Sequence, residues 1–258
     1  MAITISVALQ KGGVGKSTTS QCLANVFGSI GKKVLVIDMD SQANLTDSSG
    51  VYEPEFTITK VMSGACNIKD AIIKCKYYDL LAGDDYLTNV EWNNVSPTLL
   101  DETINPIKDL YDYIIIDTPP SLGNLLFNSL STSDYVIIPV DSRPYALKGL
   151  NKLYATINEI QNGANVNLKI LGILLTRYNN RTKLSKEMKD VLNSIAKEID
   201  TIVFDTIVRE SIVIAESQGS CVPLIDYAKN NNLTVDYTML GFEILKRINE
   251  VNFNEKGC

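Results

Sequence analysis

A glycine-rich loop near the start of the chain reads Lys11-Gly12-Gly13-Val14-Gly15-Lys16-Ser17-Thr18. It follows an apolar run at 3–9 and precedes a segment with helical periodicity, and a strand, a glycine loop and a helix in this order are typical of a phosphate-binding loop. Glycines let backbone N–H groups approach phosphate oxygens without Cβ clashes, and the helix directs its positive dipole end at the same anion. In such a loop Lys16 would reach the β- and γ-phosphates and Ser17 would offer its hydroxyl to Mg²⁺. The sequence therefore predicts a nucleotide site formed by Lys11, Gly12, Gly13, Val14, Gly15, Lys16, Ser17 and Thr18.

One position of this loop departs from the common pattern. A glycine is expected five residues before Gly15, but the chain has Gln10 there, followed by Lys11. A second lysine is unnecessary for holding one nucleotide from one side, so Lys11 needs an explanation of its own.

The composition restricts the possible functions. The 258 residues are 45% hydrophobic and 21% charged, which fits one large α/β domain spanning 1–258. Net charge is −6, so nucleic-acid binding would require a local basic patch, and the absence of histidine excludes His-based triads and His metal sites. The five cysteines form no CxxC pair, which argues against a disulfide framework or a metal cluster. With no signal peptide and no apolar run of ~18 residues, we expect a cytoplasmic protein.

Buried strands alternate with amphipathic helices along the chain. Strands are predicted at 3–9, 33–39, 113–117, 135–140 and 168–175, with shorter ones at 78–82, 201–204 and 222–225. Helices are predicted from the loop to Gly31, at 147–160, at 182–199 and at 235–251, and residues 45–100 are otherwise interpreted as crossover helices and loops. This alternation predicts a doubly wound, mostly parallel α/β sheet flanked by helices, with ligands at the carboxyl ends of the strands.

Carboxylates follow two of these strands. Asp117 ends the run at 113–117, and Asp38 and Asp40 end the run at 33–39. Because parallel strands end at one edge of the sheet, these side chains should converge on the phosphates. Asp117 fits the carboxylate that holds Mg²⁺, directly or through water, and one of the other two is a candidate for polarising the attacking water. Asp38 and Asp40 have alternate parity, and the sequence does not choose between them.

Three motifs together resemble a known family. The loop, the segment Asp38-Met39-Asp40-Ser41-Gln42-Ala43-Asn44 and the segment Asp117-Thr118-Pro119-Pro120 look like the deviant Walker A loop and acidic motifs of the ParA/MinD superfamily. The match is closest to the ParA (Soj-like) partition ATPases and covers nearly the whole chain. The resemblance implies an Mg²⁺-dependent ATPase whose ATP-bound homodimer binds DNA nonspecifically and whose hydrolysis is stimulated by a ParB-type centromere-binding protein, in plasmid or chromosome partition.

The resemblance also implies roles for individual residues. Lys11 would cross to the phosphates of the partner subunit in an ATP-sandwich dimer, Asp40 would act on the catalytic water, and Asp38 would support the loop lysine and the Mg²⁺ shell. The implied metal residues are therefore Ser17, Asp38 and Asp117. For the adenine the expected residues are Thr176, Arg177, Val208 and Glu210, although this chain lacks the proline and asparagine that often flank the Arg209 position in relatives.

A basic segment is the candidate DNA contact. Between Arg177 and Lys189 the chain has five basic residues and one acid, a local charge of +4, and a partition ATPase would use such a patch to bind DNA phosphates without reading sequence. The predicted contacts are Arg181, Lys183, Lys186 and Arg209. Some relatives carry a second arginine four residues after the Arg209 position, and here Val213 replaces it. DNA binding would place the protein at the nucleoid.

Two other functions remain possible at this point. A membrane-cycling ATPase of the MinD kind would need a basic amphipathic C-terminal tail, whereas residues 252–258 are polar and short. A metabolic ligase of the dethiobiotin-synthetase kind would need a substrate pocket beside the phosphates and would have no use for Lys11. An Fe–S reductase is excluded because no cysteine lies at a plausible cluster position.

Overall fold

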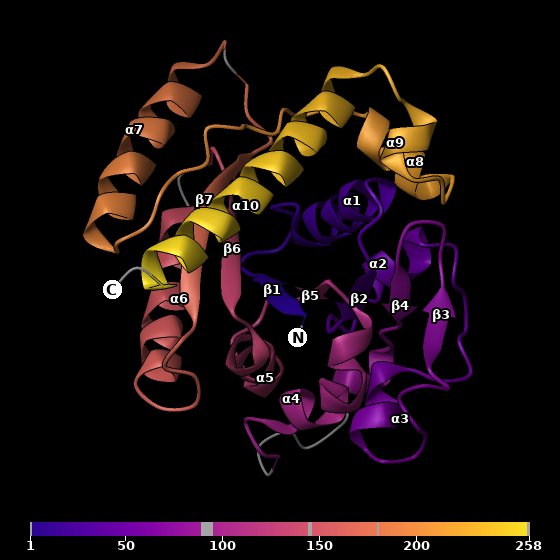
Figure 1. Ribbon diagram of the computed structural model, residues 1–258. Helices are drawn as coiled ribbons and strands as arrows, with labels where there is room; N and C mark the ends of the chain where they lie inside the picture. The colour runs from indigo at the N-terminus through magenta and orange to yellow at the C-terminus, as the bar shows by residue number, and fades with distance from the viewer. Residues whose placement is uncertain (1, 89–94, 144–145, 180, 257–258) are drawn as a thin grey trace.

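The computed structural model describes residues 2–88, 95–143, 146–179 and 181–256. Its centre is a seven-stranded sheet with the order β3-β4-β2-β5-β1-β6-β7, in which β3 is antiparallel to β4 and the other neighbours are parallel (Figure 1). The strands are β1 (Ile3–Val7), β2 (Val34–Asp38), β3 (Ile72–Lys74), β4 (Asp79–Leu81), β5 (Tyr113–Asp117), β6 (Tyr135–Asp141) and β7 (Lys169–Thr176). The predicted α/β fold with a mostly parallel sheet is confirmed.

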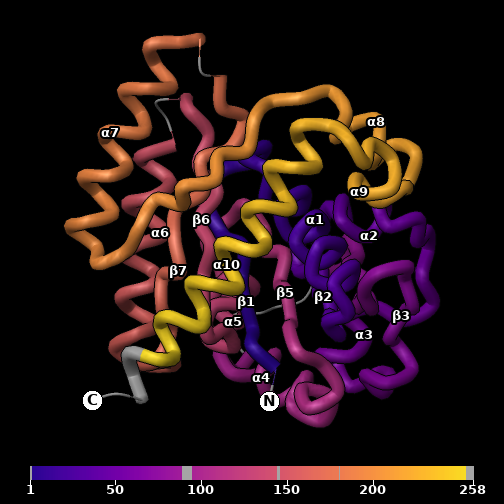
Figure 2. Tube along the Cα trace, turned by 45° about the horizontal axis from the view of Figure 1, so that its top comes forward, coloured from indigo at the N-terminus to yellow at the C-terminus, as the bar shows by residue number. Residues whose placement is uncertain are grey.

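Helices cover both faces of this sheet. Two hydrophobic layers form, one beneath α1, α9 and α10 and the other beneath α3, α4, α5, α6 and α7. Side chains of β2 and β5 alternate between the two layers, whereas the apolar side chains of β1 all enter the first. The helices are α1 (Lys16–Ser29), α2 (Asn44–Ser48), α3 (Ile58–Met62), η1 (Asp85–Thr88), α4 (Leu99–Ile104), η3 (Asn105–Leu110), α5 (Asn124–Thr132), α6 (Ala146–Gln161), α7 (Lys183–Glu198), α8 (Val213–Gly219), α9 (Leu224–Tyr227) and α10 (Asn232–Lys256). The last helix packs beside α1 and runs diagonally across the sheet (Figure 2).

Strand register places the carboxyl ends of the central strands side by side. Val7, the last residue of β1, is the register partner of Asp117, and Asp117 is the partner of Asp38. β2 and β5 are apolar up to their terminal aspartates, β1 alternates apolar residues with Thr4 and Ser6, and all three strands are buried on both faces, as central parallel strands require. The phosphate loop and both acidic segments consequently leave the sheet at one edge.

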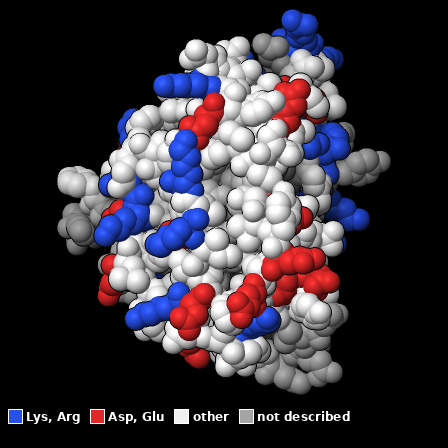
Figure 3. Space-filling view, turned by 90° about the vertical axis from the view of Figure 1, so that its right-hand side faces the viewer, with Lys and Arg blue, Asp and Glu red and all other residues white. Residues whose placement is uncertain are grey.

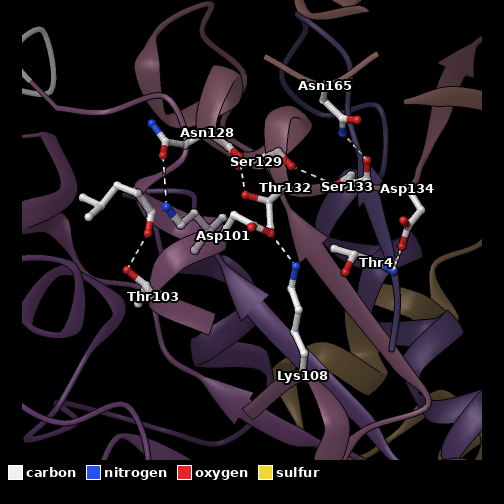
Figure 4. Close-up of polar contacts among 12 residues, drawn as sticks. Thr4, Asp101, Thr103, Lys108, Asn128, Ser129, Thr132, Ser133, Asp134 and Asn165 are labelled. Atoms are coloured by element: carbon white, nitrogen blue, oxygen red, sulfur yellow. Dashed lines mark hydrogen bonds and ion pairs between the residues drawn. The ribbon is translucent and has the colours of Figure 1, made fainter. Parts of the chain in front are cut away.

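Polar contacts connect the segments near the amino-terminal ends of β1 and β6 (Figure 4). The Asp134 carboxylate accepts a hydrogen bond from the backbone N–H of Thr4 at 2.7 Å, and Asn128 accepts one from the N–H of Leu100 at 3.1 Å. Lys108 pairs with Asp101 in the same region. These contacts connect β1 and α4 to the segments around α5, so β1, which leads into the glycine loop, is held at its far end as well.

The structure corrects several sequence predictions. The strand predicted at 222–225 is wrong, because Pro223 is the N-cap of α9 and lacks the N–H that a central strand needs. The segment at 201–204 contributes only an isolated bridge between Val203 and Ile173. β3 was not predicted, and α10 begins earlier and ends later than 235–251. Short or terminal elements of this kind depend on neighbours that periodicity does not reveal.

Close packing of α1 leads to a stability prediction. At Gly28 an added Cβ would lie 1.8 Å from the backbone carbonyl oxygen of Tyr77, so Gly28→Ala forces two backbones apart. We expect the free energy of unfolding in urea to fall by about 3 kcal/mol. At Gly219, the last residue of α8, an added Cβ meets nothing within 4 Å, so Gly219→Ala is the control and should leave stability unchanged or slightly raised. Equal losses in both variants would contradict this packing.

Candidate functional site

The glycine loop has the backbone that phosphate binding requires. Gly13 and Gly15 adopt φ of 73° and 89°, a left-handed conformation that favours glycine, and Gly15 is the N-cap of α1. A Cβ added at Gly12 or Gly13 would meet no atom within 4 Å, so open space lies in front of the loop. The N-terminus of α1 faces that space with its first N–H groups, which is the arrangement of a helix-terminal anion site.

Lys16 lies at the start of α1 and is only 6% exposed. Its ammonium donates to the carbonyl oxygen of Lys11 at 3.3 Å. Burial lowers the pKa of Lys16, and the nearby carboxylates of Asp117 and Asp40 partly oppose that shift. Lys16 is thus a buried cation held among carboxylates at the floor of the loop.

Asp117 is the least satisfied of these carboxylates. It is fully buried, its Oδ1 accepts a hydrogen bond from the Ser20 hydroxyl at 3.3 Å, and its Oδ2 has no hydrogen-bond partner among the described residues. Burial raises its pKa well above the usual range, the Asp38 carboxylate raises it further, and Ser17 and Lys16 lower it. A buried carboxylate oxygen without a partner, beside the Ser17 hydroxyl, fits a cation.

The donor set suits Mg²⁺ in particular. The described residues contain no cluster of three or more acidic, cysteine or histidine side chains that could hold a metal alone. Mg²⁺ commonly binds through one or two carboxylates, with waters and substrate phosphates completing its shell. Asp117 and Ser17, at the floor of a phosphate loop, would therefore hold this ion together with the nucleotide.

The structure gives Asp38 and Asp40 different surroundings, a distinction that the family resemblance implied and strand parity alone did not. Asp38 is fully buried, and its oxygens accept hydrogen bonds from the Thr46 hydroxyl at 2.7 Å, the Thr46 N–H at 3.0 Å and the Asp40 N–H at 3.1 Å. Burial raises its pKa to about 6, against the opposing effect of these hydrogen bonds. Asp40 instead lines the cleft in front of the loop and accepts from the Gln42 N–H at 3.1 Å. Asp38 therefore fixes the backbone of Asp40 from a buried position, and Asp40 can contact a ligand in the cleft.

This cleft has a volume of about 570 Å³. Its described lining comprises Gly12, Gly13, Gly15, Lys16, Ser17, Thr18, Asp40, Gln42, Asn44, Asp47, Ser48, Tyr52, Pro120, Arg177, Gln218 and Gly219. Sequence analysis did not identify Tyr52 or Gln218, and Gln218 donates to the Thr18 hydroxyl at 3.3 Å. These two residues reach the loop only because the chain after α2 and the helix α8 fold back over it, for which the sequence carried no local signal.

A second cavity of about 420 Å³ adjoins the loop and brings together the predicted base residues. Gly15, Thr18, Thr176, Arg177, Val208 and Glu210 line it. The Thr176 hydroxyl donates to the Val14 carbonyl at 2.9 Å, which ties β7 to the loop. Its apolar walls are residues that the sequence analysis missed, namely Ile212, Ile214, Ala215, Leu233 and Tyr237. An apolar cavity beside a phosphate site suits a planar base.

The predicted DNA residues lie at one end of α7. Arg181, Lys183 and Lys186 are exposed, and Lys183 forms an i,i+4 pair with Glu187 at 3.4 Å. Arg209 lies close to Arg181, since both line one surface pocket, but its guanidinium is bound by Asp236 at 2.7 and 2.8 Å. The charge of Arg209 is therefore already compensated and that of Lys183 is paired with Glu187, so Arg181 and Lys186 are the two of the four that form no ion pair with a described residue.

The described residues on the other side of the molecule include both basic and acidic side chains (Figure 3). Figure 3 shows the side of the molecule that carries α3, β3, α8 and α9 in Figure 1. On this side Lys and Arg side chains are interspersed with Asp and Glu. The helix α7 lies at the opposite side. None of the helices in the described ranges is long and apolar enough to cross a membrane.

Comparison with known proteins gives consistent relatives. Residues 2–170 match a family model described as an AAA domain. The chain is 34% identical over 254 residues to a sporulation initiation inhibitor protein Soj of Bacillus subtilis, covering 95% of this chain and 98% of that protein. It is 31% identical over 256 residues to a chromosome-partitioning ATPase Soj of Treponema pallidum, covering 96% and 98%.

Solved structures with the same fold include enzymes of different function. A cobyrinic acid a,c-diamide synthase of Mycobacterium smegmatis with bound ADP and magnesium superimposes with a TM-score of 0.83 at 26% identity, covering 96% of each chain. A cell division ATPase MinD of Pyrococcus furiosus gives a TM-score of 0.78 at 27% identity, covering 95% of this chain and 99% of that one. The fold is therefore one that binds nucleotide and magnesium in a relative.

Asp38 leads to a prediction for the pH dependence of stability. Its folded-state pKa of about 6 lies above the ~3.9 of an unfolded aspartate, so the folded chain binds this proton more tightly. The resulting stabilisation is fully present below about pH 4 and is lost as pH rises through about 6. Asp38→Asn lacks this contribution at every pH. In urea unfolding without nucleotide, the free energy of unfolding of the wild type should fall by about 2–3 kcal/mol relative to that of Asp38→Asn as pH rises from about 4 to above 6. A difference between the two proteins that stays constant with pH would contradict the raised pKa of Asp38.

Proposed function

The chain belongs to the ParA/Soj family of P-loop ATPases, and from this we propose that it hydrolyses ATP with Mg²⁺ and partitions a plasmid or chromosome as an ATP-dependent homodimer. The observation that carries the proposal is the cleft in which Lys16 and Asp40 face the open space before the glycine loop, with Asp117 buried behind them. The chromosome-partitioning ATPase Soj of Treponema pallidum supports the biological role, and the relative in Bacillus subtilis bears the same name, Soj. On this proposal residues 1–258 act as a single ATPase domain.

The chain's own residues divide the chemistry among themselves. Lys16 and the loop N–H groups bind and orient the phosphates, and Ser17 and Asp117 hold Mg²⁺, which when bound offsets phosphate charge. Asp40 positions the attacking water and polarises it, while Asp38 fixes the backbone that carries Asp40 through the 3.1 Å hydrogen bond to its N–H. Thr176, Arg177, Val208 and Glu210 surround the base. Lys11 acts on the phosphates of the partner subunit.

The biological cycle follows from this chemistry. The ATP-bound dimer binds DNA phosphates nonspecifically through Arg181, Lys183 and Lys186, with Arg209 beside them, and so associates with the nucleoid in the cytoplasm. A ParB-type centromere-binding protein stimulates hydrolysis and releases the dimer. The overall charge of −6 supports a local rather than a general DNA surface.

A metabolic ligase is the second candidate, because the diamide synthase of Mycobacterium smegmatis shares this fold and binds ADP and magnesium. A ligase would require a cosubstrate for turnover, whereas the proposed function requires hydrolysis stimulated by DNA and a ParB-type protein. The MinD neighbour raises membrane cycling as a further alternative, which pelleting with liposomes in ATP would detect. Steady-state phosphate release with and without DNA separates the first two.

Three loop and strand-end variants test the roles of the charged residues. Lys16→Ala should abolish ATP binding, measured with a fluorescent ATP analogue. Lys11→Ala should bind ATP as the wild type does but remain monomeric in light scattering. Asp40→Ala should still form the ATP dimer while phosphate release falls by about 10²–10⁴-fold. A wild-type chain that stays monomeric in ATP, with Asp40→Ala equally active, would refute the proposal.

The salt dependence of DNA binding tests the α7 patch. Affinity for DNA of unrelated sequences should be similar and should fall steeply with salt. Lys186→Ala should make the slope of log K against log salt less negative by about 0.9, because one phosphate contact is lost. Lys32→Ala, an exposed lysine just before β2 at the opposite edge of the sheet, is the matched control and should keep the wild-type slope. Equal slopes in all three proteins would contradict a role for α7.

A further inference from the structure

The side chain of Lys11 is held away from the cleft by a carboxylate on β6. Its ammonium lies 2.8 Å from Oδ1 and 3.0 Å from Oδ2 of Asp141, the last residue of that strand. The Asp141 side chain is 1% exposed and the Lys11 side chain 20%. The described residues that line the 570 Å³ cleft include Gly12 and Lys16 but not Lys11. In the single chain Lys11 therefore points to Asp141 and not to the nucleotide space.

A second cation binds the same carboxylate. The Arg143 guanidinium donates through Nε to Asp141 Oδ2 at 2.7 Å and pairs with the same oxygen through Nη2, and its backbone N–H donates to Oδ1 at 3.2 Å. Burial would raise the pKa of Asp141, but hydrogen bonds from Arg143 and Lys11 outweigh this and keep it below its usual range. Asp141 is thus a charged, buried group with two cationic partners, of which Arg143 comes from its own segment and Lys11 from the phosphate loop.

The backbone beneath Lys11 is fixed, so its side chain is the part that can move. The Lys11 N–H donates to the Leu9 carbonyl at 2.8 Å, and an added Cβ at Gly149 would lie 2.8 Å from the Gln10 carbonyl, which shows how closely α6 packs on this turn. Lys16 also donates to the Lys11 carbonyl. A change of partner by Lys11 therefore requires rotation of its side chain away from Asp141, with the loop in place.

We infer that Asp141 is a positioning residue that holds Lys11 in the free chain, and that Arg143 retains the carboxylate when Lys11 leaves for nucleotide phosphates. A buried carboxylate left without a cation is strongly unfavourable, so Arg143 makes the departure of Lys11 possible. Asp141 opposes ATP-dependent dimerisation by stabilising the free chain, and Arg143 favours it by keeping Asp141 paired. This inference rests on the proposed function only for the destination of Lys11.

Substitutions of Asp141 and Arg143 are predicted to change the dimer dissociation constant in opposite directions. The dimer dissociation constant is measured by analytical ultracentrifugation with ATPγS and Mg²⁺, and with ADP as the negative state. Asp141→Asn should lower this constant about tenfold, and Arg143→Ala should raise it about tenfold. The double variant should resemble Asp141→Asn, because without the carboxylate Arg143 has nothing to retain. Asp134→Asn, the same substitution before the other end of β6, is the matched control and should leave the constant unchanged.

A second readout examines the single chain and does not depend on the dimer. Reductive methylation with formaldehyde and borohydride, read by mass spectrometry, should modify Lys11 several-fold faster in Asp141→Asn than in the wild type, while the melting temperature confirms that both are folded. Shifts of both variants in the same direction, or no change in Asp141→Asn in either assay, would overturn the inference. If the wild type stays monomeric in ATPγS, the proposed dimer fails, and the methylation rates then decide by themselves whether Asp141 holds Lys11.

Discussion

The site depends on the burial of two carboxylates side by side at the end of the sheet. Asp38 and Asp117 are register partners on β2 and β5, and both are fully buried. Like charges in such surroundings raise each other's pKa unless hydrogen bonds or cations compensate them. The chain satisfies Asp38 with donors from Thr46 and Asp40, but it leaves Oδ2 of Asp117 without a partner beside Lys16. Oδ2 of Asp117 is thus the carboxylate oxygen of this pair that still lacks a hydrogen-bond donor among the described residues. It lies below the loop where phosphates and Mg²⁺ would bind together.

The parts of this arrangement that follow from local signals could be predicted from the sequence. The loop was identified because its glycines must adopt conformations that other residues rarely take, and Gly13 and Gly15 do so. β5 was predicted with its observed bounds, since four consecutive β-forming residues before Asp117 admit few other structures. Convergence of Asp38 and Asp117 then followed from the rule that parallel strands end at one edge. The choice between Asp38 and Asp40 did not follow, because it depends on Thr46 reaching back from α2.

Contacts between distant segments account for what the sequence analysis missed. Arg209 was predicted as a DNA contact, but Asp236 on α10 binds its guanidinium, and nothing in the chain between these two residues signals that pairing. Tyr52 reaches the cleft from the chain after α2, and Gln218 reaches it from α8. Asp141 is different, because a signal was present: it is an acidic residue at the end of a buried parallel strand, as Asp38 and Asp117 are. The predicted strand stopped at residue 140, one residue short of the carboxylate, so the same reasoning was not applied to it.

The contact with Asp141 gives Lys11, the extra lysine of the loop, a partner within its own chain. Three parallel strands, β2, β5 and β6, each end in a buried aspartate, and the loop supplies two lysines to meet them. Lys16 lies near Asp117, which ends β5, and Asp40, which follows β2, and would remain there when phosphate adds its own charge. Lys11 serves Asp141, which Arg143 can also neutralise, so it is the one loop cation whose departure leaves no buried charge unpaired. A loop of this kind can bind nucleotide in the single chain through Lys16. It can then release Lys11 from Asp141 to contact the phosphates of a partner subunit when the dimer forms.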